Sequence, residues 1–386
     1  MPADNLPEAQ SRLIDDEPSQ SVKVSVLSSE KLASRRRWRH LSDKTAKVSI
    51  AVGGISVIVA ILLIFAYLFY EVVPLFAGAK VEEAASYDLQ DSSESLHLAI
   101  EEQSEMAMRL GDDGVARFFD LESGENAATI AVKVPSGATI TSFALDSEQS
   151  GLFALGLNTG EAVVARYAYD TRFAQLDNRR ILTPKIDYPF GEIPYTLAVD
   201  KPLASIALRT SGENMMLAAT ARGGELSLLK ASKQTSLFAA FDLGGGAEFE
   251  IEERRLSGMT LGGEQLFIDG DRFWLFVIDD EGLARLLSLR TAFTAPNPQF
   301  EVQALLTEGR ANPTDISFLL GGISLLVGDD QGAISQWFLT KRDDTVALEK
   351  IRSFQDSASP VVSLSPEQRR KSFVSVDAQG VISLFN

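Results

Sequence analysis

The stretch GDDGVARFFDL, residues 111–121, sets two carboxylates and a glycine directly ahead of a phenylalanine pair. Neighbouring acids can serve as catalytic or metal-binding groups, so Asp112 and Asp113 are the first candidate site residues of the chain. The same letters also describe a chain reversal, because aspartate favours turns and glycine supplies the positive φ that a tight turn needs. The choice between the two interpretations depends on whether the stretch is unique.

Similar stretches recur along the chain, each with a polar turn that closes on glycine and then alternating apolar residues. They are GLNTGEAVVARY (156–167), TARGGELSLLKA (220–231), IDDEGLARLLSL (278–289), GDDQGAISQWFL (328–339) and VDAQGVISLFN (376–386). An apolar run precedes each turn: MAMRL (106–110), GLFAL (151–155), MMLAA (215–219), FWLFV (273–277), ISLLV (323–327) and SFVSV (372–376). A further run lies earlier in most units: LHLAI (96–100), TSFAL (141–145), ASIAL (204–208), DISFLL (315–320) and VVSLS (361–365). Strand, turn with glycine, strand is the pattern of a β-hairpin.

The spacing of these turns predicts the fold. The closing glycines are Gly114, Gly160, Gly224, Gly282, Gly332 and Gly380, which are separated by 46, 64, 58, 50 and 48 residues. Periods near 40–50 residues with three or four short strands each are typical of β-propeller blades, and repeat proteins place insertions in loops. A helical solenoid would need a period of about 3.6 residues, whereas these runs alternate with a period near two. A β-sandwich is possible for any one unit but does not explain the repetition. We therefore predict an all-β, WD40-like propeller of six to seven blades.

Repetition also decides between the two interpretations of the acids. The counterparts of Asp112, two residues before each closing glycine, are Asn158, Arg222, Asp280, Asp330 and Ala378. Such variation suits a turn position and not one unique site. We therefore expect Asp112 and Asp113 to bond backbone amides in the turn and to stay solvated. A calcium loop would need acids at alternating positions and a distal glutamate, a pattern that is missing here.

The sequence contains few other signals of catalysis. The chain has no cysteine and two histidines, His40 and His97, which the topology below places on opposite sides of a membrane. Neither G-x-S-x-G nor the Walker lysine loop occurs. The pairs Arg179–Arg180, Arg254–Arg255 and Arg369–Arg370 could meet an anion, although we expect scattered solvated turns. A net charge of −17 argues against a nucleic-acid partner. We predict no enzyme activity, no cofactor, and no catalytic, cofactor-binding or metal-binding residue, and the sequence leaves any substrate-binding residue unknown.

A membrane anchor is the clearest feature of the N-terminal part. Residues 31–47 hold seven cations and one anion, and residues 48–70 follow with no charged side chain. At about 1.5 Å per residue, a helix over 48–70 is longer than a hydrocarbon core of about 30 Å. Residues 71–113 are strongly acidic, with Lys80 and Arg109 as the only cations. The positive-inside rule then places residues 1–47 in the cytoplasm and those after Tyr70 outside.

Two alternatives compete with an uncleaved anchor. A buried core helix could be equally apolar, but seven flanking cations followed by acids do not suit one. A cleaved signal peptide is suggested by the small residues Ala77-Gly78-Ala79, although the charged leader and the apolar run are both longer than a signal peptide requires. We expect the anchor to be retained.

These features divide the chain into five parts. Residues 1–30 are polar, acidic and proline-containing, and we expect a disordered cytoplasmic tail. Residues 31–47 form a basic juxtamembrane segment, which either sets the topology or also binds anionic membrane lipid. Residues 48–70 are the transmembrane helix, 71–90 a linker, and 91–386 the periplasmic β-propeller domain.

Two stretches carry a resemblance to a known family. FAYLFYEVVPLFAGAKV (65–81), entered from the basic segment, and HLAIEEQSEMAMRLGDDGVARFFDLESGE (97–125) resemble the N-terminal part of a Pst-type phosphate ABC transporter permease. The resemblance is to the form with a large periplasmic insertion after the first transmembrane helix. It implies an inner-membrane subunit that pairs with a second permease subunit, docks a cytoplasmic ATPase and receives phosphate from a periplasmic phosphate-binding protein.

The chain also departs from that family. It offers one span and no EAA-type coupling loop; Glu82-Glu83-Ala84-Ala85 lies outside the membrane in the topology above. No translocation residue of the family can be assigned, and we expect the 386 residues to be a truncated reading of a longer permease. The alternative is a free-standing, membrane-anchored β-propeller that scaffolds envelope assembly or signalling.

Overall fold

The chain forms two compact units in a computed structural model, one over Met1–Val81 and one over Glu82–Asn386. We describe each unit by itself. The residues that the structure describes are 29–76, 86–87, 92–174, 180–221, 223–234, 249–256, 258–259, 261–262, 264–342, 345–354, 358–367 and 369–385.

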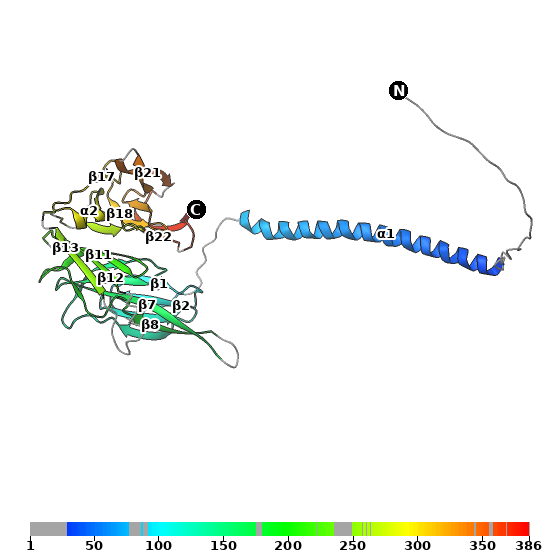
Figure 1. Cartoon of the computed structure of the whole chain (residues 1–386), viewed down its shortest axis with the longest axis horizontal. Coiled ribbons are helices and arrows are strands. Elements are labelled where there is room, and N and C mark those ends of the chain that lie inside the picture. Colours follow the sequence, from blue (N-terminus) through cyan, green and yellow to red (C-terminus); the bar gives the residue numbers. More distant parts are fainter. Residues whose placement is uncertain are drawn as a thin grey trace, which may run out of the picture. The chain divides into compact units, whose positions relative to one another are not determined.

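The first unit contains one long helix, α1 (Ser29–Val72), drawn in blue in Figure 1. It ends in a single 3-10 turn, η1 (Val73–Phe76), where Pro74 lacks the amide that an α-helix would use. The helix begins well before residue 48, so the basic segment is helical as well. Residues Leu41–Val72 are long and apolar enough to cross a membrane, and every described side chain among them is exposed. This agrees with a single predicted span.

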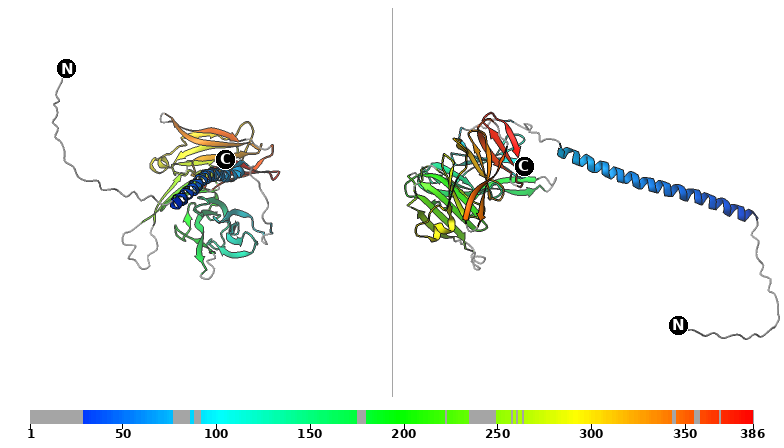
Figure 2. Two further views of the ribbon diagram at one scale, coloured as in Figure 1. Left: turned by 90° about the vertical axis from the view of Figure 1, so that its right-hand side faces the viewer. Right: turned by 90° about the horizontal axis from the view of Figure 1, so that it is seen from above.

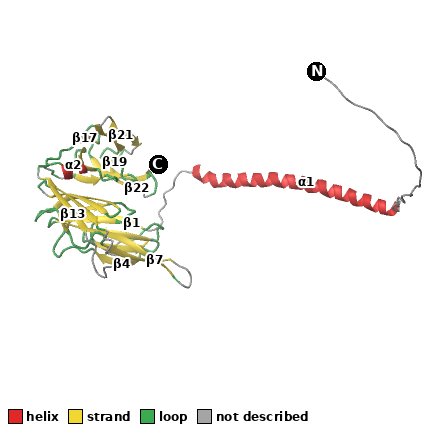
Figure 3. Cartoon of the chain, in the orientation of Figure 1, coloured by secondary structure: helices red, strands yellow, loops and turns green. Residues whose placement is uncertain are grey.

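The second unit consists of antiparallel sheets, drawn in yellow in Figure 3. We name them blades 1 to 6 in chain order. Blade 1 contains β1 (Ser95–Ile100), β2 (Met106–Gly111), β3 (Val115–Asp120) and β4 (Asn126–Ala131). Blade 2 contains β5 (Ile140–Leu145), β6 (Leu152–Leu157), β7 (Glu161–Phe173) and β8 (Arg180–Asp187), with β9 (Tyr195–Thr196) paired to β7. Blade 3 contains β10 (Leu203–Ser211), β11 (Asn214–Ala221), β12 (Leu226–Lys233) and β13 (Phe249–Leu256).

The remaining blades repeat the same order. Blade 4 contains β14 (Gln265–Ile268), β15 (Trp274–Ile278), β16 (Leu283–Ser288) and β17 (Val302–Leu305), with a short helix, α2 (Leu289–Thr294), between its last two strands. Blade 5 contains β18 (Pro313–Phe318), β19 (Ser324–Asp329), β20 (Ile334–Arg342) and β21 (Thr345–Phe354). Blade 6 contains β22 (Val361–Pro366), β23 (Phe373–Asp377) and β24 (Ile382–Phe385). Neighbouring strands in each blade follow one another along the chain, as in a propeller. The two views of Figure 2 show the blades from other sides.

The core lies between consecutive blades. The second strand of blade 2, β6, is buried along its whole length because a blade covers each of its faces. Apolar clusters join blades 1 and 2 around Phe118 and Phe153, blades 2 and 3 around Met215, and blades 3 and 4 around Leu228 and Leu275. Two more join blades 4 and 5 around Leu286 and Leu325, and blades 5 and 6 around Phe373. The second strands that lie between two such clusters are therefore apolar on both faces, which explains why their sequences are nearly continuous apolar runs.

The closing glycines form the turns that the sequence predicts. All six have a positive φ, and each donates its amide to the carbonyl oxygen three residues earlier, over distances of 2.9–3.2 Å. At Gly160 (φ +87°) the chain also passes so close to Ala198 that an added Cβ would overlap its carbonyl oxygen. The prediction of an all-β propeller is confirmed, and six blades are present in the described residues.

Candidate functional site

The acid pair of the opening stretch lies in the turn between β2 and β3. The carboxylate of Asp113 accepts the amide of Val115 at 3.1 Å and forms an ion pair with Arg117 at 2.6 Å. The carboxylate of Asp112 accepts the amide of Glu94 at 2.9 Å, and the amide of Asp112 donates to the carbonyl of Glu94 at 2.9 Å. Asp113 thus bonds an amide within the turn as expected, whereas Asp112 bonds one outside it. Asp112 thus links the turn to the residue before β1, and Asp113 links it to β3.

The bond from Asp112 belongs to a repeated feature. In three blades the residue two before the closing glycine exchanges two hydrogen bonds with the residue just before the first strand; we call this arrangement the clasp. Asn158 makes it with Thr139 through distances of 2.9 and 3.0 Å, and Asp330 makes it with Asn312 through 3.1 and 3.0 Å. Ala378 keeps only the backbone half, to the carbonyl of Pro360. In blades 1, 2 and 5 the clasp ties the start of the first strand to the turn, and Asn158 shows that it does not depend on a carboxylate.

A second set of turn acids was not singled out from the sequence. Asp279, Asp329 and Asp377 stand three residues before the closing glycine of blades 4, 5 and 6. Each carboxylate accepts two backbone amides of its own turn, over distances of 2.8–3.2 Å. Counting back three residues, and not two, would have found them. Their shared geometry indicates a structural role in shaping the turn.

An ion pair is buried between blades 1 and 2. Arg180, at the start of β8, donates to the carboxylate of Glu101 in the β1–β2 turn and also approaches Glu105 at 3.4 Å. Burial alone would raise the pKa of Glu101, but the hydrogen bonds from Arg180 and from the amide of Gln103 together lower it. The same contact raises the pKa of Arg180. Glu101 is thus held as a carboxylate that joins two blades.

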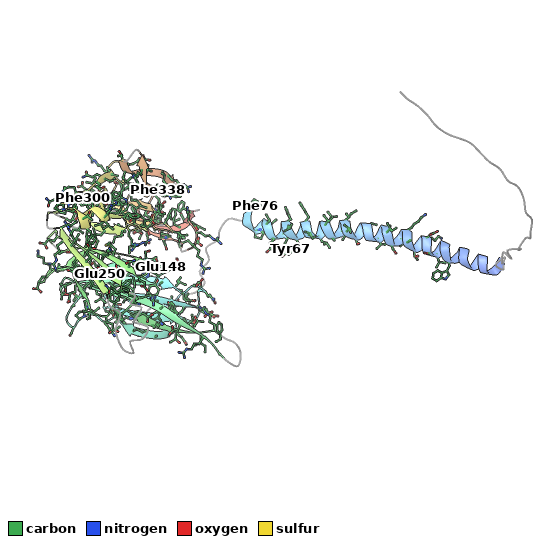
Figure 4. The ribbon with its side chains drawn as sticks, in the orientation of Figure 1. Tyr67, Phe76, Glu148, Glu250, Phe300 and Phe338 are labelled. Atoms are coloured by element: carbon green, nitrogen blue, oxygen red, sulfur yellow. The ribbon has the colours of Figure 1, made fainter. Side chains whose placement is uncertain are left out.

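His97 lies in β1, four residues before Glu101. Its ring is stacked on Phe143, with 5.6 Å between centroids, and its Nε2 is 3.5 Å from a carboxylate oxygen of Glu148. The hydroxyl of Tyr167 is 3.0 Å from the other carboxylate oxygen, and burial together with Glu148 raises the pKa of Tyr167. Glu148 is labelled in Figure 4. His40 belongs to the other unit, in α1.

The arginine pairs differ from the expected scattered turns. Arg180 lies in β8, and Arg254, in β13, donates to the carbonyl oxygens of Phe293, Ala295 and Pro296. Arg369 pairs with Glu102 and Arg370 with Glu367, both in loops. The prediction is wrong for Arg180 and Arg254, because strand side chains at the outer blade edge reach across to the neighbouring segments. The guanidinium groups of Arg180, Arg254, Arg369 and Arg370 each have an acceptor on this protein, and Arg179 lies outside the described residues.

No group of three or more histidine, aspartate or glutamate side chains is placed to hold a metal ion within the described ranges. The turn acids and Glu101 are bonded to backbone amides or to arginine, and Glu148 accepts the hydroxyl of Tyr167. What the described residues offer to other molecules is surface: loops, blade edges and the exposed apolar residues of α1, of which Tyr67 is labelled in Figure 4.

Comparison with known proteins adds one structural likeness. No protein-family model matches the chain, and no curated protein matches it in sequence. A crystal structure described as the β-propeller domain of Cps50 (Swd1) from Myceliophteria thermophila is similar, with 12% sequence identity and a TM-score of 0.45. The match covers 77% of this chain and 84% of that one. The fold assignment itself rests on the six sheets of one strand order described above.

Proposed function

We propose that this chain is the membrane-anchored N-terminal portion of an inner-membrane permease subunit of a phosphate ABC importer, with the propeller as a periplasmic docking or regulatory domain. The observation that carries the proposal is the exposure of α1: its apolar side chains from Leu41 to Val72 are exposed. Burying one large apolar side chain contributes about 1.5–3 kcal/mol, so such a helix favours a bilayer over water. The identity of the importer comes from the resemblance of residues 65–81 and 97–125.

The orientation follows from charge. Seven cations precede the uncharged run in residues 31–47, and acidic residues follow it. Cytoplasmic flanks of membrane helices carry the excess of lysine and arginine. The N-terminus is therefore cytoplasmic in this proposal, and the propeller is periplasmic. Contact of the basic flank with anionic lipid would strengthen the same arrangement.

A docking role suits the propeller better than chemistry does. The carboxylates of the described turn acids accept hydrogen bonds from backbone amides, and the buried carboxylate of Glu101 is paired with Arg180. A propeller presents many loops on a rigid ring of sheets, which is a common platform for protein partners. The partners implied by the resemblance are a second permease subunit, a cytoplasmic ATPase and a periplasmic phosphate-binding protein.

Capture from phosphate-limited bacteria tests this proposal. The tagged chain is expressed in cells that carry a Pst-type importer, and detergent-solubilised membranes are passed over the tag resin. We expect the phosphate-binding protein and the second permease subunit to be recovered, with recovery of the binding protein lost when residues 92–385 are deleted and α1 is kept. Recovery of neither importer component from starved cells would contradict the proposal.

The second candidate is a free-standing anchored propeller that scaffolds envelope assembly or signalling. The observation in its favour is that the described residues contain one candidate span, whereas a permease needs several. The reading frame after the codon for Asn386 separates the two candidates. Further hydrophobic spans in frame support the permease, and a stop codon there supports the scaffold.

A further inference from the structure

The blades contact one another through the same positions each time. Side chains two and four residues after a closing glycine point toward the next blade in the chain. Leu226 and Leu228 of blade 3, for example, pack in one cluster with Leu266 and Leu275 of blade 4. The apolar side chains at these positions in blades 1 to 5 are 0–2% exposed, and they are Ala116, Phe118, Ala162, Val164, Leu226, Leu228, Ala284, Leu286 and Ile334. A following blade covers all nine.

Blade 6 departs from this series. The same two positions after Gly380 are Ile382 and Leu384 in β24, which are 49% and 51% exposed. Their side chains are as apolar as those of the other blades, and β24 has the same pairing to the strand before it. The sixth blade therefore carries the residues of a blade interface on a face that nothing in the described part of the chain covers.

Blade 1 departs from the series on its opposite face. Leu98 and Ile100 of β1 stand opposite Arg109 and Ala107, on the face that in other blades receives the preceding blade. Leu98 is 59% exposed and Ile100 is 56% exposed, whereas their counterparts Ile206, Leu208, Leu266 and Ile268 in blades 3 and 4 are 4–5% exposed. The two faces with exposed apolar side chains thus belong to the first and the last blade, although Arg109 and Ala107 on the same face of blade 1 are buried. We call the space between these two faces the seam.

The seam also has an open strand edge. In blades 1 to 5 the third strand pairs with a fourth, whereas β24 pairs only with β23 in the described residues. Blades 6 and 1 meet at one end through an ion pair between Arg369 and Glu102, yet none of the apolar clusters includes residues of both. An unpaired edge beside exposed apolar side chains is a strong template for further β-structure.

We propose that polypeptide following Asn386 in the same chain completes blade 6 with a fourth strand and then forms a seventh blade that fills the seam. The occupant is a β-sheet because both faces of the seam continue the established blade interface. It belongs to the same chain because, in each complete blade, the strand that pairs with the third strand is the next segment of that chain. The inference rests on the proposed function in one respect, since that function expects a longer polypeptide.

Single cysteines test the proposal cleanly, because the chain contains none of its own. Leu98→Cys and Leu384→Cys are made in the 386-residue chain and in the full polypeptide that the gene encodes, and their alkylation by a maleimide is followed by mass spectrometry. We expect rapid reaction at both sites in the shorter chain and a rate at least about tenfold lower in the longer one, since a buried thiol reacts only through local opening. Ile323→Cys, exposed in a turn of blade 5, is the matched control and reacts equally fast in both. Ala284→Cys, fully buried, gives the slow limit.

Several results would overturn the proposal. Slow alkylation in the 386-residue chain alone would mean that blades 6 and 1 close directly. Equal rates in both chains, or a stop codon directly after Asn386, would mean that no seventh blade follows. Protection that grows with protein concentration, or that needs a second protein, would mean that another molecule fills the seam. The proposed function is judged separately. Protection of the two cysteines from alkylation in a polypeptide without further membrane spans would support the seventh blade and contradict the permease. Further membrane spans without such protection would support the permease and contradict the seventh blade.

Discussion

Arg180 donates a hydrogen bond to Glu101, a residue 79 positions earlier in the chain and 7% exposed at the boundary of blades 1 and 2. The two residues join the start of β8, at the outer edge of blade 2, to the β1–β2 turn. Neither side chain was expected to meet the other, because their pairing depends on how two blades pack and not on any local pattern.

Glu101→Gln should lower the melting temperature by about 2–4 °C at neutral pH, because the charged hydrogen bonds to Arg180 are lost. The lowered pKa of Glu101 fixes the sign of the pH dependence. Its stabilising contribution is present above the pKa of an unfolded glutamate, about 4.3, and is lost as the pH falls through the lower folded value. Thermal melts from pH 7 to pH 3 should therefore show the two proteins converging in acid. Glu122→Gln, at an exposed position, is the control. A difference that is constant with pH would contradict this account.

Gly160→Ala should destabilise the propeller strongly. A left-handed backbone costs a non-glycine residue about 1–2 kcal/mol, and overlap with the carbonyl of Ala198 adds a packing cost of about 1–3 kcal/mol. Gly137→Ala is matched in φ, +82° against +87°, but an added Cβ there has nothing within 4 Å. Urea denaturation should rank Gly160→Ala as clearly less stable than Gly137→Ala. Equal losses would mean that the close approach to Ala198 is absent.

Asp329→Ala should cost about 1–3 kcal/mol, since two backbone amides of the turn, those of Gln331 and Ala333, lose their acceptor. Asp280→Ala, an exposed residue of the corresponding turn in blade 4, should change stability by less than about 0.5 kcal/mol. Calcium, magnesium or EDTA should leave the melting temperature of the parent chain and both variants unchanged. A calcium-dependent rise that Asp329→Ala abolishes would instead make this turn a metal site.

The sequence was sufficient to predict the repeated hairpin, but it was not sufficient to predict the contacts between repeats. Glycine at a fixed place after an apolar run identifies the central hairpin of every blade, because the turn needs a positive φ whatever its neighbours are. The fourth strands were not located. β13, FEIEERRL, carries five charged residues, and β8 contains a proline, since an outer edge faces water and need not look like a core strand. The first strand of blade 4, β14, was missed as well because it is only four residues long.

The turn acids also show that a local sequence pattern does not predict contacts between distant residues. Repetition excluded Asp112 and Asp113 as a unique site, but the partner of Asp112 is Glu94, which no local rule indicates. The more regular acids, Asp279, Asp329 and Asp377, occur only in the last three blades; in the first three the same position is Gly111, Leu157 or Ala221. A position that changes from apolar to acidic half-way along the repeat is hard to recognise from one sequence.

The central claim is a single crossing that leaves residues 1–47 inside the cell and the propeller outside. Ser19→Cys and Ser136→Cys, made separately in the cysteine-free chain, are treated in spheroplasts with a membrane-impermeant maleimide. The account predicts that Ser136→Cys, exposed in a loop of the propeller, is labelled at once, and that Ser19→Cys is labelled only after detergent is added. Labelling of Ser19→Cys in sealed spheroplasts, with protection of Ser136→Cys, would contradict it.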